Sequence, residues 1–277
     1  MPELPEVETI TNAMRPHLLG KTFTDIEIFF PRLRYELTVH QSPELLNTRI
    51  TDIRRRARYT IVEIQNRHAV IFHYGMTGAV RICPPEEPRL KHEHVIFHIS
   101  DGTTLRFEDP RRFGFIQQVR LPKSGSDPDE LNHLGSEPLT RKFTARHLQK
   151  AFEKKTMPIK TAIMDNAIVV GVGNIYANEA LFMTGINPKT PANQLTEVQL
   201  KRFVETIKKT LKKAIKAGGT TIADFKGVDG SEGKFNQELS VYGREGEACK
   251  HCTDIIIKIK QSGRASFYCP TCQPCSQ

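Results

Sequence analysis

The sequence predicts an α+β fold with two domains: a β-rich N-terminal half that follows a single helix, and a helical C-terminal half that ends in a small β-hairpin. Short β-branched or alternating stretches fill positions 22–120, whereas apolar residues recur at helical spacing from about residue 144 onward. Five of the six cysteines lie in the last 29 residues. The chain of 277 residues is long enough for two domains that each bury a core.

The N-terminal half begins with a predicted amphipathic helix from Pro5 to Leu19, because apolar residues recur there at spacings of three and four up to Gly20. Seven strands are predicted next, at 22–30, 49–64, 68–74, 79–83, 94–99, 103–107 and 113–120. Seven strands after one helix indicate a sandwich or a barrel. The segment 122–130, rich in Pro, Ser and Asp, is the best candidate for a surface linker.

The C-terminal half reads as four helices, at 144–155, about 159–166, 173–183 and 196–217. The last opens with a capping box formed by Thr196 and Gln199 and ends at two glycines. The Gly-rich segment 218–235 that follows is predicted to be a mobile, functional loop.

Charge is divided unevenly along the chain. The net charge is +9, yet residues 1–135 hold 18 basic and 18 acidic side chains, while residues 136–277 hold 22 and 13. A basic half beside a neutral half predicts that one part grips a polyanion. No stretch approaches the length of a membrane span, and the absence of a secretory signal predicts a reducing cytoplasm.

The cysteines predict a structural zinc site. Cys249 and Cys252 form one CxxC pair, and after sixteen residues Cys269 and Cys272 form a second. Two such pairs at this spacing are typical of four-cysteine zinc sites. Cys275 lies three residues after Cys272 and is the alternative ligand, although the first four flank the strand end directly. The residues between the pairs predict two strands joined at 261–264, with an arginine at the tip that suits a phosphate.

The first residues suggest either chemistry or a simple helix start. Removal of Met1 would leave Pro2 as a secondary amine beside the carboxylate of Glu3. A terminal amine titrates at about pH 8 and can form a Schiff base with a sugar aldehyde carbon. The alternative is that the two prolines only begin the helix, a position where proline is common.

Six motifs, in order along the chain, carry a family resemblance. They are Pro-Glu-Leu-Pro-Glu-Val-Glu at 2–8, His-Tyr-Gly-Met-Thr-Gly at 73–78, Lys-His-Glu-His at 91–94, Asp-Pro-Arg-Arg-Phe-Gly at 109–114, Val-Gly-Asn-Ile-Tyr-Ala at 172–177, and Val-Tyr-Gly-Arg at 241–244 before the cysteines. Together they resemble bacterial formamidopyrimidine-DNA glycosylases over essentially the full length. The resemblance implies a catalytic β-sandwich at 1–132, a linker at 133–150, a helix-two-turn-helix domain with a lesion loop at 151–238, and a zinc hairpin at 239–277. It implies a monomer with one structural Zn²⁺ that binds damaged double-stranded DNA between its halves.

The same resemblance implies roles for individual residues. Pro2 would attack C1′ of a damaged nucleotide and Glu3 would donate the proton that opens the sugar, after which β- and δ-elimination cut the strand. Because a damaged base must leave the stack, Met76, Arg111 and Phe113 match the residues that fill its place. Judged by residue type alone, Met76 and Phe113 would instead belong to a strand core.

DNA contacts are implied for a further group of residues, for each of which ordinary surface exposure is the alternative: His73, His92, Lys155, Lys160, Asn174, Tyr242, Lys258 and Arg264, with Arg264 grouped among the catalytic residues. Two positions depart from the family. Arg58 stands at the position of a lysine assigned to proton transfer in β-elimination, and arginine holds its proton too tightly for that, so we expect Arg58 to bind phosphate and leave its elimination role open. Ala223 stands in the lesion loop where a basic residue is common, which could shift base preference.

The predicted function is base-excision DNA repair by a bifunctional glycosylase and abasic-site lyase acting on oxidised purines such as 8-oxoguanine and formamidopyrimidines. An oxidised-pyrimidine glycosylase of the same fold is one alternative. A noncatalytic zinc-ribbon protein that binds nucleic acid is the other; it would explain the basic half but not Pro2 and Glu3.

Overall fold

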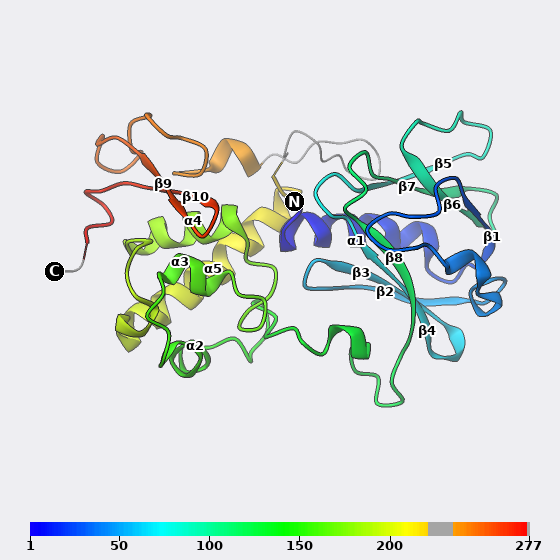
Figure 1. The fold of residues 1–277 in the computed structure, drawn as a ribbon, viewed down its shortest axis with the longest axis horizontal. Helices are drawn as coiled ribbons and strands as arrows, with labels where there is room; N and C mark the ends of the chain where they lie inside the picture. The colour runs from blue at the N-terminus through cyan, green and yellow to red at the C-terminus, as the bar shows by residue number, and fades with distance from the viewer. Residues whose placement is uncertain (221–234, 276–277) are drawn as a thin grey trace. The chain divides into compact units, whose positions relative to one another are not determined.

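The structure, a computed structural model, describes residues 1–220 and 235–275, apart from the side chains of two residues at 236 and 237. The described residues form two compact units, one of 1–133 with 217–220 and the other of 134–216 with 235–275 (Figure 1). Most of the predicted loop at 218–235, including Ala223, lies outside the described residues. No helix in the described ranges is long and apolar enough to cross a membrane.

The first unit is a β-sandwich with one flanking helix, as predicted. One antiparallel sheet has the order β1 (Phe23–Ile28), β6 (Glu93–Ile99), β7 (Thr104–Glu108), β5 (Ala79–Cys83), and the other has β2 (Ile50–Arg56), β3 (Tyr59–Ile64), β4 (His68–His73), β8 (Phe115–Arg120). Phe72 of one sheet packs on Phe97 and Phe107 of the other, with ring centroids 5.6 and 6.4 Å apart. These rings are fully buried and form the centre of the core.

Helix α1 (Leu4–Leu18) covers this core with the apolar stripe that its sequence predicted. Val7, Ile10, Met14 and Leu18 are all at most 1% exposed and belong to the sandwich core. The helix packs on β2 and β3, so its N-terminus is held by that sheet.

The prediction of a single strand at 49–64 is wrong, because the structure divides it into β2 and β3. The two strands pair as an antiparallel hairpin in which Arg56 lies opposite Tyr59. The turn is Ala57-Arg58, and Ala57 has a φ of 53°. The usual turn residues at positive φ are Gly, Asn and Asp, so this turn carries no sequence signal.

The second unit contains α2 (Ala145–Phe152), α3 (Ile159–Ile163), α4 (Asn174–Thr184) and α5 (Glu197–Lys216), followed by the hairpin of β9 (Ile257–Gln261) and β10 (Arg264–Tyr268). Helix α4 packs against both α5 and β10. Nine of its eleven residues are buried, as expected of a helix with partners on several sides. Thr144 caps α2 by accepting a hydrogen bond from His147 N–H at 3.1 Å.

The chain passes between the units near His133. Helix α2 begins within the range 133–150 that was assigned to a linker, and it packs on α5. The Pro-rich segment 122–130 belongs to the first unit, where the Asp127 carboxylate accepts from Arg54 at 2.7 Å and Arg56 at 2.6 Å. Short 3-10 turns complete the described elements, at Val39–Gln41, Pro43–Leu45, Gln65–Arg67, Asp129–Leu131, Ala192–Gln194 and Phe235–Glu238.

Candidate active site and zinc site

The N-terminus is fixed at the positive end of α1. Pro2 is buried and Glu3 is 4% exposed. Glu3 N–H donates to Oε2 of Glu6 at 2.9 Å, while Oε1 of Glu6 accepts from both the N–H and the hydroxyl of Thr220, each at 2.9 Å. A helix N-terminus disfavours a cation beside it, so this position favours the neutral, nucleophilic form of an amine at Pro2.

The β2–β3 turn brings Arg58 to the same place. Nη1 of Arg58 lies 3.6 Å from the sulfur of Met1. The turn is tied to α1 by Arg55, whose Nε donates to Oε2 of Glu8 at 2.5 Å and whose Nη1 donates to the carbonyl of Ala57 at 3.1 Å. A guanidinium is therefore held beside the first residues of the chain.

His73 ends β4 with its imidazole enclosed by aromatic rings. It stacks on Phe115 with centroids 5.2 Å apart and packs on Tyr59 at 5.1 Å. Burial, together with the positive charges of Arg34 and Arg58, lowers the pKa of His73 to about 4. Nδ1 accepts the N–H of Gly75 at 3.2 Å, which leaves the proton of the neutral ring on Nε2.

Two loops expose large side chains that would otherwise belong in a core. Met76, between β4 and β5, is 41% exposed, and Phe113, between β7 and β8, is 47% exposed. Arg111 lies over the Phe113 ring, with its Cζ 4.6 Å from the centroid. Exposed side chains of this size in a well-packed domain indicate an interaction site.

The buried carboxylate of Asp109 locks the two loops together. One oxygen accepts from the hydroxyl of Thr77 at 2.6 Å, and the other accepts from Gly114 N–H at 2.7 Å. The backbones also touch, since a Cβ on Gly75 would lie 2.5 Å from Gly114 N. Asp109 N–H donates to the carbonyl of His92 at 3.0 Å, so the residue that joins the two loops is also bonded to His92.

A hollow of about 330 Å³ joins these features within the first unit. It is lined by Met1, His73, Gly75, Met76 and Phe113, and by two arginines, Arg34 and Arg112. The first residue of the chain, two exposed apolar side chains and two arginines thus border one space. Sequence reasoning did not select Arg34 or Arg112; Arg112 lies inside a quoted motif, whereas Arg34 lies in an irregular segment without any pattern.

In the second unit, the hairpin tip carries Arg264. The turn residues Ser262 and Gly263 have φ of 46° and 78°, the left-handed pair of a type I′ turn. Arg264 is exposed at the start of β10, and the ammonium of Lys160, which is 1% exposed, donates to the carbonyl of Ala265 at 3.0 Å. Lys160 therefore braces the tip from beneath, while Lys258 is exposed and paired with Glu245 at 2.7 Å.

Three other residues of this unit were selected from the sequence. Asn174 is the first residue of α4, and its side-chain Oδ1 is buried without a hydrogen-bond partner among the described residues. Lys155 follows α2 and lies 3.7 Å from Asp165. Tyr242 is half-buried, and its N–H donates to Oε1 of Glu179 at 2.9 Å.

The four predicted cysteines form one cluster in which all sulfur atoms lie within 4.8 Å of one another. The pairs Cys249–Cys272 and Cys252–Cys269 are 3.8 and 3.4 Å apart. Zn–S bonds of about 2.3 Å in a tetrahedron place sulfur atoms about 3.8 Å apart, so the cluster fits a zinc ion. The sulfur of Cys275 instead lies 3.6 Å from the Asn187 amide, which settles the ligand set in favour of Cys272.

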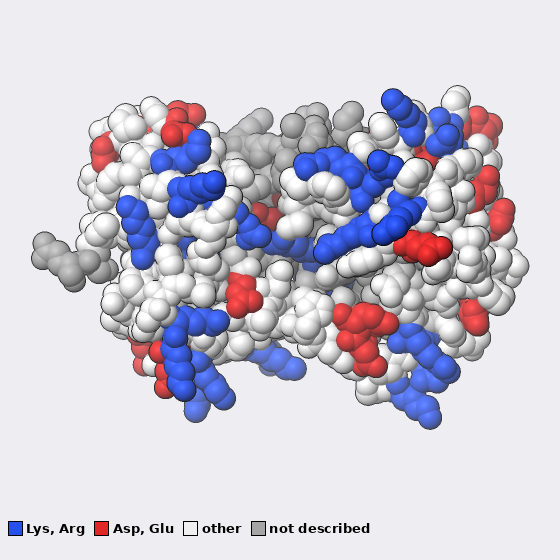
Figure 2. Space-filling model, in the orientation of Figure 1, with Lys and Arg blue, Asp and Glu red and all other residues white. Residues whose placement is uncertain are grey.

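Basic side chains occur in clusters on the surface of both units, with acidic clusters on the same face (Figure 2). The first unit contributes exposed or half-exposed arginines near the hollow, although its own charges balance.

Comparison with known proteins agrees with this arrangement. The formamidopyrimidine-DNA glycosylase N-terminal domain matches residues 1–116, the H2TH domain of the same enzymes matches 134–226, and a zinc finger found in FPG and IleRS matches 246–274. The formamidopyrimidine-DNA glycosylase of Rickettsia conorii is 44% identical over 273 residues, covering 99% of each chain. The chain belongs to the formamidopyrimidine-DNA glycosylase family. The enzyme of Laribacter hongkongensis, 41% identical over 276 residues, covers 99% of this chain and 100% of its own.

Solved structures of the formamidopyrimidine-DNA glycosylase family share the whole fold. A Lactococcus lactis FPG variant in complex with Fapy-dG-containing DNA has a TM-score of 0.89 at 32% identity, covering 99% of this chain and 100% of its own. MutM from Thermus thermophilus has a TM-score of 0.86 at 33% identity and covers 98% of both chains. The predicted fold class and zinc cofactor are therefore confirmed.

Proposed function

We propose that this chain is a bifunctional DNA glycosylase and abasic-site lyase of base-excision repair that removes oxidised purines from duplex DNA. The observation that carries the proposal is the hollow where the N-terminus meets His73 and the exposed side chains of Met76 and Phe113. A noncatalytic binder would have no use for a buried Pro2-Glu3 pair held at a helix N-terminus.

The chemistry begins once Met1 is removed. The Pro2 nitrogen forms a bond to C1′ of the damaged nucleotide, and the glycosidic bond breaks with its electron pair leaving on the base. The nitrogen loses its proton, the C1′–O4′ bond breaks as the iminium forms, and O4′ takes a proton from Glu3. Loss of a proton from C2′ expels the 3′ phosphate, and loss of one from C4′ expels the 5′ phosphate.

The damaged nucleotide leaves the base stack before this chemistry, and the gap needs a filler. Phe113 is suited to wedge between neighbouring bases, and Met76 adapts to an irregular space. Arg111, stacked on Phe113, has donors for the partner base, expected to be cytosine. The near-half exposure of Met76 and Phe113 supports this role over a core role.

Phosphate contacts hold the duplex. His73 supplies its Nε2–H as a neutral donor, and His92 and Arg58 supply further donors from the first unit. In the second unit Arg264 acts at the hairpin tip with Lys160 bracing it, and Lys155, Asn174, Tyr242 and Lys258 contact the backbone. Asn174 opens α4, and helix N-termini favour phosphate.

Cys249, Cys252, Cys269 and Cys272 would hold a zinc ion that organises the hairpin; because four thiolates would fill its coordination, the ion would supply no chemistry to the reaction. We assign the catalytic sandwich to 1–132, the linker to 133–150, the helix-two-turn-helix domain to 151–238 and the zinc hairpin to 239–277. We also propose that the protein acts as a monomer on DNA in the bacterial cytoplasm, at the nucleoid; the relatives are bacterial enzymes.

Oxidised pyrimidines form a second candidate substrate class. A wild-type Lactococcus lactis FPG, with a TM-score of 0.87 at 32% identity, has been solved in complex with oxidised-pyrimidine-containing DNA. Excision is therefore compared on duplexes with 8-oxoguanine, a formamidopyrimidine and an oxidised pyrimidine opposite matched bases.

The deciding experiment is borohydride trapping on a duplex with 8-oxoguanine opposite cytosine, followed by mass spectrometry of the crosslinked peptide. An adduct on the peptide that begins with Pro2 is expected. A control with a tag ahead of Pro2 should bind DNA and form no adduct. Tight binding without an adduct on either this duplex or an abasic one would overturn the enzyme assignment.

A further inference from the structure

A buried ion pair in the β1-β6-β7-β5 sheet has no place in the chemistry described above. Arg106 of β7 and Glu93 of β6 are each 1% exposed, and Nη1 of Arg106 lies 3.4 Å from Oε2 of Glu93. Buried charges are costly to desolvate, and an ion pair often fails to recover that cost. The position of this pair therefore calls for an explanation beyond stability.

The Arg106 guanidinium organises the β5–β6 connection. It donates to the carbonyls of Glu87 at 2.9 Å, Pro84 at 3.0 Å and Pro85 at 3.2 Å, and its Nε donates to the hydroxyl of Thr104 at 3.0 Å. The connecting segment thus wraps around one planar group. Five donors in a fixed fork make arginine able to hold several carbonyls at once, and lysine lacks this geometry.

Glu93 closes the end of the same segment. Its N–H donates to the carbonyl of Leu90 at 3.1 Å, and its Oε2 accepts from Leu90 N–H at 2.8 Å. Its other oxygen accepts from Nη2 of Arg81 at 2.7 Å and from Nε at 3.0 Å. The four-residue turn 90–93 is therefore closed twice by Glu93, and His92 lies inside it.

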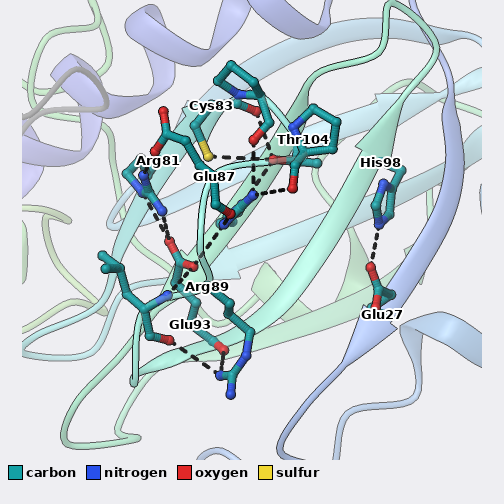
Figure 3. Close-up of polar contacts among 12 residues, drawn as sticks. Glu27, Arg81, Cys83, Glu87, Arg89, Glu93, His98 and Thr104 are labelled. Carbon is teal, nitrogen blue, oxygen red and sulfur yellow. Dashed lines mark hydrogen bonds and ion pairs between the residues drawn. The ribbon is translucent and has the colours of Figure 1, made fainter.

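Two neighbours hold the turn from outside. Arg89 donates to the carbonyl of Glu93 at 2.9 Å and lies over the Phe29 ring, with its Cζ 4.4 Å from the centroid. Arg81 of β5 also pairs with Glu87 in the middle of the connection as well as with Glu93 at its far end (Figure 3). Together with the bonds of Arg106 and Glu93, these contacts tie the connection between residues 84 and 93 to β5 and β6.

We propose that Arg106 and Glu93 are positioning residues that hold the turn 90–93 so that His92 meets a DNA phosphate. The inference rests on the proposed function, which assigns that contact to His92. Neither residue touches DNA: Arg106 shapes the connection, Glu93 closes the turn, and His92 makes the contact. Their effect is on DNA affinity rather than on the bonds made at Pro2.

The test measures Kd for a duplex with an uncleavable tetrahydrofuran site, and the saturating single-turnover rate of 8-oxoguanine excision. Arg106→Met and Glu93→Gln should each raise Kd about ten- to hundredfold, the value of a hydrogen bond to a charged group, with the saturating rate within about twofold. Glu93→Gln is the more stringent variant, because removal of a negative charge would by itself tighten DNA binding, whereas the proposal expects weaker binding. Tighter or unchanged binding would overturn the proposal.

Arg54→Met is the matched control. Like Arg106, Arg54 pairs with a carboxylate; it bonds Glu63 at 2.6 Å and Asp127 at 2.7 Å, but in the other sheet and away from the turn. Its Kd should stay within about twofold of the wild type. Should Arg106→Met fail to fold in urea titrations, Glu93→Gln decides alone.

The variant His92→Ala separates positioning from general damage. In that background Arg106→Met should raise Kd by less than about twofold, since the contact it positions is already absent. If Arg106→Met raised Kd as much in that background as in the wild type, Arg106 would act through a group other than His92, and the proposal would be overturned. Wild-type excision is measured in parallel: its absence would refute the proposed function, whereas wild-type excision with unaltered Kd in both variants would refute the positioning role alone.

Discussion

The contact between the two loops of the first unit can be tested at a single glycine. Gly75 has a φ of +59°, and a Cβ there would lie 2.5 Å from both Gly114 N and Phe113 C. Carbon atoms pack at about 3.5 Å, so Gly75→Ala forces the loops apart by up to about 1 Å. Gly102 has a φ of +87° and no atom within 4 Å of the added Cβ, which makes Gly102→Ala a control for backbone strain alone.

Alanine at a positive φ costs about 1–2 kcal/mol, so urea unfolding should show that both variants lose at least this much free energy of unfolding. Only Gly75→Ala moves Met76 and Phe113 relative to each other. A displacement of about 1 Å can cost on the order of a hundredfold in rate, so single-turnover excision should fall by about that factor in Gly75→Ala and stay near wild type in Gly102→Ala. Equal excision rates in the two variants would refute the reasoning.

Three further predictions concern separate parts of the molecule. Met76→Ala and Phe113→Ala should change the free energy of unfolding by less than about 1 kcal/mol, because both side chains are nearly half exposed, while excision is lost; a large drop in Tm would contradict this. The pKa of His73 is lowered to about 4 in the folded protein. Its neutral, buried ring therefore contributes about 3 kcal/mol to the free energy of unfolding above pH 6.5, and this contribution is lost as pH falls toward 4. Urea titrations at pH 4–7 should show that loss in the wild type and a smaller one in His73→Gln. Cys252→Ser should abolish zinc binding and raise the Kd for DNA at least tenfold. Tenfold is about the value of one charged contact, here the contact that Arg264 makes at the hairpin tip. A variant that still binds one zinc per chain with unchanged Kd would contradict this.

Sequence patterns predicted the features of this protein that depend on residues close together in the chain. The apolar repeat of α1 predicted which side chains face the core, because helix geometry places residues three and four apart on one face. The two CxxC pairs predicted the zinc ligands, because each pair is short enough to wrap one side of an ion. The turn at Ala57 was missed, because alanine at positive φ gives no turn signal; in the structure Arg55 bonds both the Ala57 carbonyl and Glu8 of α1.

The sequence by itself determined the α1 stripe, the zinc ligands and, through its ordered motifs, the formamidopyrimidine-DNA glycosylase family. Only the tertiary structure decided that Met76 and Phe113 are exposed, that Lys160 is buried under the hairpin tip, and that Arg106 binds the backbone carbonyls of the β5–β6 connection. These outcomes depend on contacts between residues far apart in the chain, which no local periodicity encodes. Burial and partners are properties of the packed molecule, so the same residue types carry different roles in different places.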